Sequence, residues 1–296
     1  MNSAVKCVFC GTNTAERPAA ESATIRCDIR EFGDETFTVW RCAECGSLHA
    51  KEPIDSERYY RHYPVKLQRY DFFFRALLRK RMGILKHAGL KSGNTLLDYG
   101  CGSGHFVRYA REHRVRAEGY DPYSEEFGDP SVLGRSYDFV TAQDVLEHVD
   151  DPHALVDDLK SYAAPCGCIT IGTPNADAID LHHPLDQVGP LHQPYHRHIP
   201  STAELQRMAS EGGWWVVEFR KDLPANSRVP FANWAFLLRY SKSAGGYLDA
   251  LCDPVSSQLN HILARPSLIF WGLFGSFFSR KNEMVVVVLC PFLTLA

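Results

Sequence analysis

Residues 95–107 read Thr95-Leu96-Leu97-Asp98-Tyr99-Gly100-Cys101-Gly102-Ser103-Gly104-His105-Phe106-Val107, and their pattern is the most informative in the chain. Its apolar start predicts a short buried strand, and the apolar residues after Gly104 recur at helical spacing. Three glycines in the pattern G-x-G-x-G let the backbone between strand and helix pass close to a ligand. The first turn of the helix would direct unpaired N–H groups and its positive dipole end at that ligand. The stretch therefore predicts a strand–turn–helix unit that binds a nucleotide-like molecule.

The acidic residues around this unit limit the classes of ligand that it could bind. A dinucleotide fingerprint reads G-x-G-x-x-G, and His105 stands where its third glycine would be. Asp98, before the glycines, would repel a pyrophosphate but would accept the ammonium group of a cofactor that carries an amino acid. Asp121 lies 17 residues after Gly104, at the end of the next strand-like run, where it would accept hydrogen bonds from ribose hydroxyls.

Residues 97–104 and Gly119-Tyr120-Asp121 resemble the landmarks of class I S-adenosylmethionine-dependent methyltransferases. The resemblance covers about residues 93–220 and the last strand. It implies methyl transfer from S-adenosylmethionine and a Rossmann-like α/β fold, whose sheet is mostly parallel with an antiparallel last strand. The residues that it assigns to cofactor binding are Asp98, Tyr99, Gly100, Cys101, Gly102, Gly104, Asp121, Pro122, Gln143 and Asp144.

Strand-like runs alternate with helical segments, which predicts a doubly wound sheet with ligands at the carboxyl ends of its strands. The segment between Asp121 and the next strand, residues 122–137, has only 16 residues. In the family it holds a further strand and a helix with an adenine contact, so we assign no adenine-binding residue. The expected strands are 95–99, 116–120, 138–142, 168–173, 214–219 and 283–290.

Two loops carry the candidate catalytic residues. The loop after the strand at 138–142 resembles the family segment that opens the substrate pocket, and Asp144 and His148 would share a face if a helix began there. The loop before a capping-box helix at Ser201 is rich in histidines and prolines. The candidate general bases are His148, then His196 and His198. Alternatively, Glu147 and His148 are a structural pair; a catalytic metal held by the histidine loop is the less favoured interpretation.

Two Cys-x-x-Cys pairs, each followed by glycine, lie in the first 50 residues. Their four thiolates suit a tetrahedral structural zinc, and the strand-like run at 36–40 leads into the second pair as in a zinc ribbon. A redox role is less favoured because no βαβ unit follows directly. The predicted zinc ligands are Cys7, Cys10, Cys42 and Cys45, with Cys27 outside the site.

The remaining segments complete the predicted domain organisation. We expect a zinc-ribbon-like domain at 1–50, a helical segment covering the cofactor at 51–92, and the methyltransferase domain at 93–296 with a helical insert at about 221–282. A helix at 67–87 would pack through Phe72, Phe73, Leu77, Leu78 and Ile84. The apolar stretch at 267–281 is interpreted as buried core, with contact to a lipid surface or a greasy substrate as the alternative.

Composition limits the partners and the compartment. The 296-residue chain has a net charge of −3, which gives no electrostatic case for a nucleic-acid partner. Its N-terminus lacks an apolar segment, and no run is long enough to span a bilayer. Ten cysteines without a secretion signal indicate thiols and metal ligands rather than disulfides. We therefore expect a cytoplasmic protein.

The sequence thus predicts methyl transfer to an oxygen, nitrogen or carbon nucleophile of a small molecule. Zinc ribbons accompany similar domains in bacterial enzymes acting on sugars, surface glycans and natural products, so the acceptor is expected in these classes. A nicotinamide-dependent oxidoreductase would explain the glycines and Asp121 but not Asp98 or His105. A non-catalytic zinc-ribbon binding protein is the other alternative, against which the intact Asp98, glycines and Asp121 argue. The sequence leaves the oligomeric state open.

Overall fold

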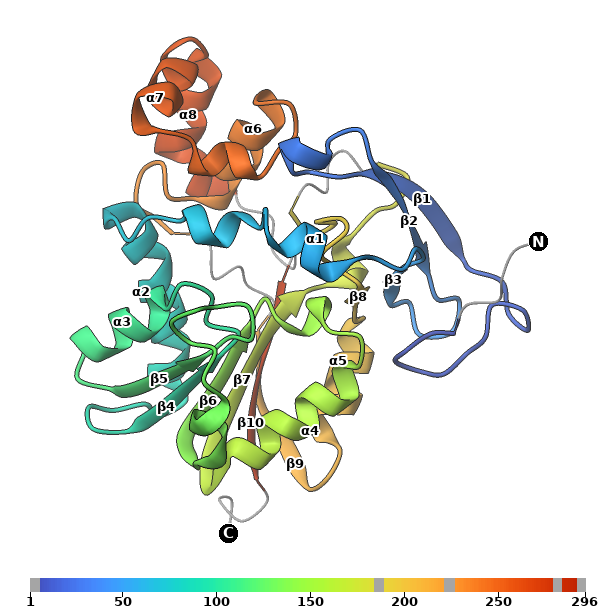
Figure 1. The fold of residues 1–296 in the computed structure, drawn as a ribbon, viewed down its shortest axis with the longest axis vertical. Helices are drawn as coiled ribbons and strands as arrows, with labels where there is room; N and C mark the ends of the chain where they lie inside the picture. Colours follow the sequence, from blue (N-terminus) through green and yellow to red (C-terminus); the bar gives the residue numbers. More distant parts are fainter. Residues whose placement is uncertain (1–5, 184–188, 221–226, 279–283, 292–296) are drawn as a thin grey trace.

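The protein is described here by a computed structural model that covers residues 6–183, 189–220, 227–278 and 284–291. A six-stranded sheet in the order β5-β4-β6-β7-β10-β9 forms its centre (Figure 1). Neighbours among β4, β5, β6 and β7 run parallel, whereas β10 is antiparallel to both β7 and β9. This topology confirms the predicted Rossmann-like sheet. Its strands are β4 (Thr95–Tyr99), β5 (Arg116–Tyr120), β6 (Tyr137–Gln143), β7 (Ala163–Pro174), β9 (Trp214–Arg220) and β10 (Met284–Pro291).

The strand bounds follow the sequence closely. β4 and β5 have the predicted bounds, and β7 begins five residues earlier than predicted, at Ala163. The first residue of the predicted closing strand, 283, lies outside the described residues. In the short segment after Asp121 the structure describes a 3₁₀ helix, Pro130–Gly134, and no strand. β5 is therefore an edge strand of the sheet.

Helices cover both faces of the sheet because successive residues of a strand point to opposite sides. Leu96 belongs to the apolar cluster formed with α2 (Phe72–His87) and α3 (His105–Glu112). Its neighbour Leu97 belongs to the cluster formed with α4 (Pro152–Tyr162) and α5 (Thr202–Ser210). α5 begins at the predicted capping box, where the Ser201 side chain accepts a hydrogen bond from the Glu204 N–H at 3.3 Å.

The helix expected at 67–87 starts later. Its N-cap is Asp71, whose side chain accepts from the Phe74 N–H at 2.9 Å, so α2 begins at Phe72. Phe72 and Phe73 are 68% and 47% exposed, and the prediction that they pack with Leu78 is wrong. They lie in the first turn, whereas burial in this helix begins at Leu78.

A second, four-stranded sheet lies beside the first and has the order β1-β2-β3-β8 (Figure 1). β1 (Glu21–Arg26), β2 (Thr36–Arg41) and β3 (Leu48–Ala50) come from the N-terminal segment. β8 (His198–Ile199) comes from the histidine-rich loop and pairs with β3. The N-terminal sheet therefore includes two residues of the loop between β7 and α5.

The insert between β9 and β10 is helical, as predicted, over the part of it that is described (227–278); residues 221–226 and 279–283 lie outside the description. Its helices are α6 (Trp234–Ser243), α7 (Val255–Leu263) and α8 (Pro266–Phe274). Arg30 forms ion pairs with Asp249 at 2.8 Å and Asp253 at 2.5 Å, which attach the insert to the N-terminal segment. Figure 1 shows α1 (Ser56–Tyr60) between the insert and the central sheet.

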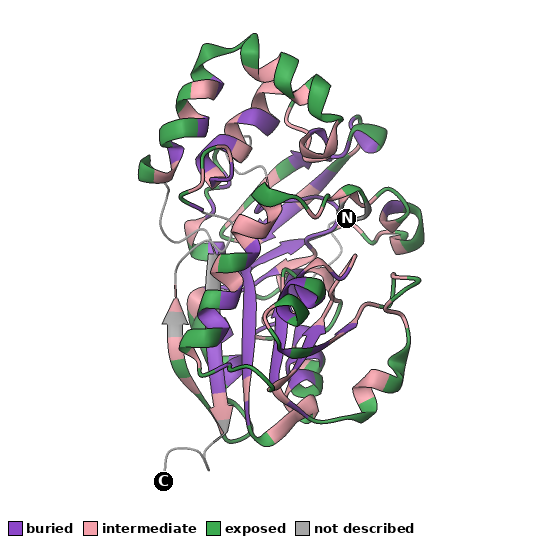
Figure 2. Cartoon of the chain, turned by 90° about the vertical axis from the view of Figure 1, so that its left-hand side faces the viewer, coloured by how far each residue is buried: buried purple, intermediate pink, exposed green. Residues whose placement is uncertain are grey.

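The prediction that the apolar stretch of the insert is buried core is wrong for most of its large side chains. Leu268 and Gly272 are buried, but Phe270, Phe274 and Phe277 are 46%, 48% and 82% exposed. Figure 2 shows exposed residues along these helices, in contrast to the buried strands of the central sheet. Residues 279–281 of the stretch lie outside the described residues. Among the helices described, none combines the length and apolar character needed to cross a membrane.

Candidate functional site

The glycine turn after β4 has a backbone that other residues could not adopt without strain. Gly100, Gly102 and Gly104 have φ of +70°, +55° and +68°, in the left-handed region. A Cβ on Gly100 would lie 2.3 Å from Cγ2 of Val145, and one on Gly104 would lie 2.2 Å from Cε2 of Phe127. The turn is therefore packed tightly against the loops after β5 and β6.

Asp121 fastens this turn to the end of β5. One carboxylate oxygen accepts from the Gly102 N–H at 2.9 Å, and the other accepts from the Tyr123 N–H at 2.9 Å. Each oxygen retains a second lone pair for a ligand hydroxyl. The parallel register places Asp98 opposite Gly119 and Thr141, so the carboxyl ends of β4, β5 and β6 meet at this edge.

Asp98 is 1% exposed and forms an ion pair with Arg81 of α2. Arg81 also donates to the Thr141 hydroxyl at 3.3 Å. Burial raises the pKa of the Asp98 carboxyl, and the Arg81 charge partly opposes this rise. Within the described residues, Oδ2 of Asp98 and Nε of Arg81 have no hydrogen-bond partner. A zwitterionic group, such as the amino-acid end of a cofactor, could satisfy both.

Arg81 was not singled out as a site residue by the sequence. One signal would have found it: the buried residues of α2 include Leu78, Met82 and Leu85, and Arg81 lies at helical spacing within this apolar stripe. A charged residue in a buried stripe needs a partner of opposite charge, and for Arg81 that partner is Asp98.

The loop after β6 adopts a conformation that differs from the expected helix. Asp144 has a φ of +56°, and only Leu146–His148 forms a 3₁₀ helix, so Asp144 and His148 share no helical face. The Gln143 side chain donates to Asp144 at 3.1 Å. Desolvation by the surrounding protein raises the pKa of the Asp144 carboxyl to about 6, and the hydrogen bond from Gln143 and the charge of Arg81 partly oppose this rise.

Glu147, His148 and His196 form a buried polar cluster where this loop meets the histidine-rich loop. Glu147 is 0% exposed, and one of its oxygens accepts from the Thr173 hydroxyl at 2.9 Å. Its other oxygen lies 3.8 Å from Nε2 of His196. Nδ1 of His148 is 3.0 Å from the Tyr60 hydroxyl. Burial lowers the pKa of His148 to about 3 and the pKa of His196 well below its usual value, so both imidazoles are neutral at pH 7.

The third candidate base, His198, faces a different neighbour. Its Nδ1 is 3.1 Å from Nδ1 of His49, and Nε2 of His49 is 3.1 Å from Sγ of Cys7. The structure thus brings His148 and His196 together and places His198 against His49, which contacts Cys7.

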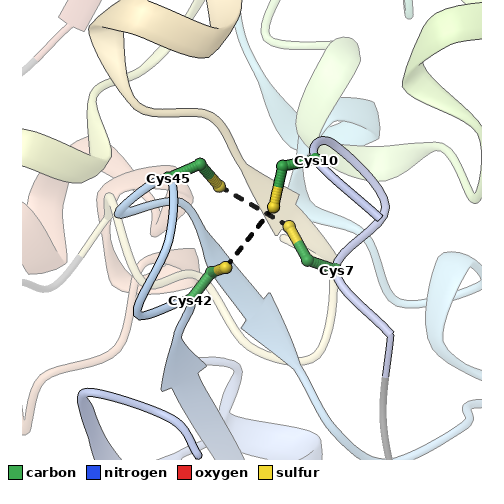
Figure 3. A group of neighbouring side chains, drawn as sticks. All are labelled: Cys7, Cys10, Cys42 and Cys45. Carbon is green, nitrogen blue, oxygen red and sulfur yellow. Dashed lines mark hydrogen bonds between the residues drawn. The ribbon is translucent and has the colours of Figure 1, made fainter. Parts of the chain in front are cut away.

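The four predicted zinc ligands form one cluster (Figure 3). Sγ of Cys7 is 3.6 Å from Sγ of Cys45, and Sγ of Cys10 is 3.6 Å from Sγ of Cys42. A tetrahedral site with Zn–S bonds of about 2.3 Å requires sulfur–sulfur separations of about 3.8 Å. The two loops are alike, because the glycine N–H donates back to the first cysteine's carbonyl at 3.0 Å in both. The cluster therefore fits a closed, four-thiolate metal site.

A comparison with protein families identifies the fold. Residues 67–219, more than half of the chain, match the model of a family described as "Methyltransferase domain". The chain belongs to this methyltransferase family. It is an S-adenosylmethionine-dependent methyltransferase. No curated protein matches its sequence.

Solved structures of other methyltransferases resemble this methyltransferase at low identity. A Haemonchus contortus phosphoethanolamine N-methyltransferase 2, bound to phosphomonomethylethanolamine and S-adenosylhomocysteine, is 15% identical with a TM-score of 0.47. The match covers 86% of this chain and 63% of that one. A Geobacter sulfurreducens methyltransferase bound to S-adenosylhomocysteine is 18% identical with a TM-score of 0.40, covering 72% of this chain and 90% of that one. A Mesorhizobium loti S-adenosylmethionine-dependent methyltransferase is 15% identical with a TM-score of 0.42, over 71% and 97% of the two chains.

The residues of the methyltransferase fit the cofactor. The glycine turn leaves no space for a Cβ at Gly100 or Gly104, and the Asp98 oxygen without a partner is a buried acceptor for a cationic group. S-adenosylmethionine supplies an ammonium group of this kind and a methyl group on a sulfonium.

Proposed function

We propose that this methyltransferase transfers a methyl group to an oxygen, nitrogen or carbon nucleophile of a small molecule, in the class of sugars, surface-glycan or natural-product intermediates. The observation that carries the proposal is the polar cluster of Glu147, His148 and His196 on the loops that follow β6 and β7. Aromatic rings surround it: Tyr60 lies 6.3 Å and Tyr63 5.8 Å from the His148 ring, centroid to centroid. Aromatic surfaces with a few convergent polar groups are typical of sites for small polar ligands.

The cofactor would be held by residues of three strand ends. Asp98 would accept the ammonium group of the amino-acid end, and Arg81, beside it, would donate to the carboxylate. Asp121 would accept from the ribose hydroxyls with its remaining lone pairs. The backbone of Tyr99 to Gly104 and the residues Pro122, Gln143 and Asp144 would complete the site; these assignments stay predictions.

Most of the acceleration would come from holding the acceptor near attack distance, an effect worth about 7–11 kcal/mol. Removal of a hydroxyl proton by a base would add about 10²–10⁴-fold. Of the predicted bases, His148 and His196 lie in the polar cluster, whereas His198 contacts His49. His148 is therefore the first residue to test, His196 the second and His198 the third.

We also propose that Cys7, Cys10, Cys42 and Cys45 bind a structural zinc ion. The separations of their sulfur atoms and the matching turns support this proposal. Four thiolates leave no open coordination position, so the zinc would stabilise the N-terminal sheet without taking part in catalysis.

The first experiment is calorimetric titration of the wild type with S-adenosylmethionine, S-adenosylhomocysteine and NAD. We expect micromolar binding of the first two ligands only, lost in Asp98→Ala and Asp121→Ala. Binding of NAD alone would favour the oxidoreductase alternative, and a folded protein that binds none of the three would favour the binding-protein alternative.

The acceptor is then sought by measuring S-adenosylhomocysteine production with sugars, glycan intermediates and natural-product intermediates. With an acceptor in hand, His148→Gln should lower kcat with little change in cofactor affinity. Unchanged turnover in His148→Gln, His196→Gln and His198→Gln would show that no histidine base is needed.

A further inference from the structure

His196 directs a hydrogen-bond acceptor at Glu147 in the cluster of Glu147, His148 and His196. Nδ1 of His196 lies 2.7 Å from the carbonyl oxygen of Pro190. A carbonyl only accepts, so Nδ1 of the neutral ring carries the hydrogen and Nε2 carries a lone pair. That lone pair lies 3.8 Å from a Glu147 oxygen, which is also an acceptor when the carboxyl is ionised.

The polar atoms at the centre of the cluster also lack partners. Within the described part of the chain, Oε1 of Glu147 and Nε2 of His148 are shielded from solvent and form no hydrogen bond. Glu147 is 0% exposed and His196 is 7% exposed. Unpaired polar atoms are rare in a protein interior, so two of them in one cluster require an explanation. A cation held between Glu147, His148 and His196 would satisfy both.

The geometry fits a metal ion. One oxygen of Glu147 and one nitrogen of each imidazole lie within 4.8 Å of one another. Two ligands of a tetrahedral ion with bonds of about 2.1 Å are separated by about 3.4 Å, so small side-chain rotations would bring these atoms into coordination.

Each proposed ligand residue is also held in place by a contact through its other polar atom, as metal ligands usually are. The remaining nitrogen of His196 contacts a carbonyl, that of His148 contacts the Tyr60 hydroxyl, and the second Glu147 oxygen contacts Thr173. Such outer contacts fix the tautomer and direction of metal ligands. In addition, the Arg197 N–H donates to the Glu147 carbonyl at 2.6 Å, which joins the two loops that carry the ligands.

We propose that Glu147, His148 and His196 bind a divalent transition-metal ion, at a site separate from the four-cysteine cluster. Two imidazoles and one carboxylate are a ligand set that Zn²⁺ and Fe²⁺ use in sites with open positions. The set differs from the four thiolates of the cysteine cluster, which form a closed site.

The open coordination positions of the metal ion would restrict which methyl acceptors the enzyme uses. This inference rests on the proposed function. A metal ion lowers the pKa of a coordinated hydroxyl or water. The ion would therefore select acceptors with a hydroxyl oxygen. In that case His148 and His196 act as metal ligands, and the ion makes a histidine base unnecessary.

Native mass spectrometry of the full chain, saturated with Zn²⁺ and then dialysed, tests the proposal without cofactor or acceptor. We expect two ions per wild-type chain and one ion in Glu147→Gln and in His196→Gln, with at least about 10²-fold weaker binding of the second ion by calorimetry. The ion retained at the cysteines and a cooperative thermal transition would show that the variants are folded. His182→Gln, in the same loop but 78% exposed, is the matched control and should retain two ions.

Two results would overturn the proposal. A wild-type chain with a single ion would mean that a proton, rather than a metal, lies between Glu147 and His196. A second ion that persists in both variants would place it elsewhere on the chain. Because neither readout uses methyl transfer, failure here leaves the proposed function intact, and failure to find methyl transfer leaves the metal site intact.

Discussion

Arg81 and Asp98 form a buried ion pair that links α2 to the first strand of the methyltransferase sheet. The Arg81 side chain is 15% exposed and the Asp98 side chain 1% exposed. The guanidinium also lies over the Phe106 ring, 4.0 Å from its centroid. The segment that precedes the sheet thus places a positive charge beside the buried Asp98 carboxylate of β4.

Replacing Arg81 with Met should lower the free energy of unfolding by about 3–5 kcal/mol, because it leaves the Asp98 charge buried without a partner. The double variant Arg81→Met/Asp98→Asn should recover most of this loss but should not bind S-adenosylmethionine. Urea unfolding and calorimetry measure the two effects. Arg79→Met, an exposed position on the same helix, is the control. Equal stability of Arg81→Met and the control would contradict a structural role for the pair.

Gly100→Ala should destabilise the protein through both strain and a clash. A left-handed alanine costs about 1–2 kcal/mol, and its Cβ would meet Val145 at 2.3 Å. Adding Val145→Ala should relieve the clash and leave only the backbone cost. Urea unfolding of the single and double variants separates the two contributions. If Val145→Ala brings no recovery, contact with Val145 is not what excludes a side chain here.

Asp144→Asn should change how stability depends on pH. Folding raises the pKa of Asp144 from 3.8 to about 6, so the folded state holds this proton more tightly than the unfolded state. The wild type therefore loses stability as pH rises from about 4 to about 6, and the asparagine variant lacks this loss. The difference in unfolding free energy between them should grow over that interval and be constant above it.

Asparagine is chosen for position 144 because it tolerates the left-handed backbone found there. Asp150→Asn, at an exposed residue of the same loop, is the control and should follow the wild-type pH profile. A pH-independent difference between Asp144→Asn and wild type would contradict the raised pKa.

His49→Phe should weaken zinc binding about 10–100-fold, the usual effect of removing a group that supports a metal ligand. If Cys7 binds zinc as a thiolate, Nε2 of His49 donates to it, and Nδ1 of His49 then accepts from His198. His49→Gln keeps a donor and should retain part of the affinity. Competition with a chromophoric chelator measures these affinities; equal values for wild type and His49→Phe would rule out the hydrogen bond to the thiolate.

The exposed phenylalanines of α8 and the following turn should favour contact with lipid. The ring centroid of Phe270 lies 5.4 Å from that of Phe274 and 6.1 Å from that of Phe278. The three rings therefore form a continuous aromatic surface. We expect the wild type to co-sediment with phosphatidylcholine vesicles and Phe274→Ser/Phe277→Ser to remain in the supernatant. Phe72→Ser, an exposed phenylalanine on α2, is the control. Wild type that stays in the supernatant would contradict the prediction.

The features that the sequence predicted well depend on short stretches of chain. β4 and β5 have their predicted bounds because each is a five-residue stretch whose end is marked in the sequence, β4 by the glycine turn and β5 by Asp121. The start of α5 follows from Ser201, and the cysteine loops follow from a spacing of three residues and one glycine. Each of these is a contact between residues a few positions apart.

The incorrect predictions concern which residues pack against each helix or strand. Phe72, Phe73 and the phenylalanines of α8 are apolar residues in helices, but helical periodicity does not state where the packed part of a helix begins. The pairing of β8 with β3 joins residues about 150 positions apart, and two residues are too few to show a strand pattern.

Local periodicity and spacing were enough to predict the sheet, the glycine turn, the cysteine cluster and the candidate residue types. The partner of each candidate is known only from the folded chain: Asp98 pairs with Arg81, His148 lies with His196 and Glu147, and His198 contacts His49. The physical reason is that loops between elements follow no repeat, so the position of a histidine along them does not fix its position in space. Packing of the sheet, α2 and the N-terminal strands fixes it instead.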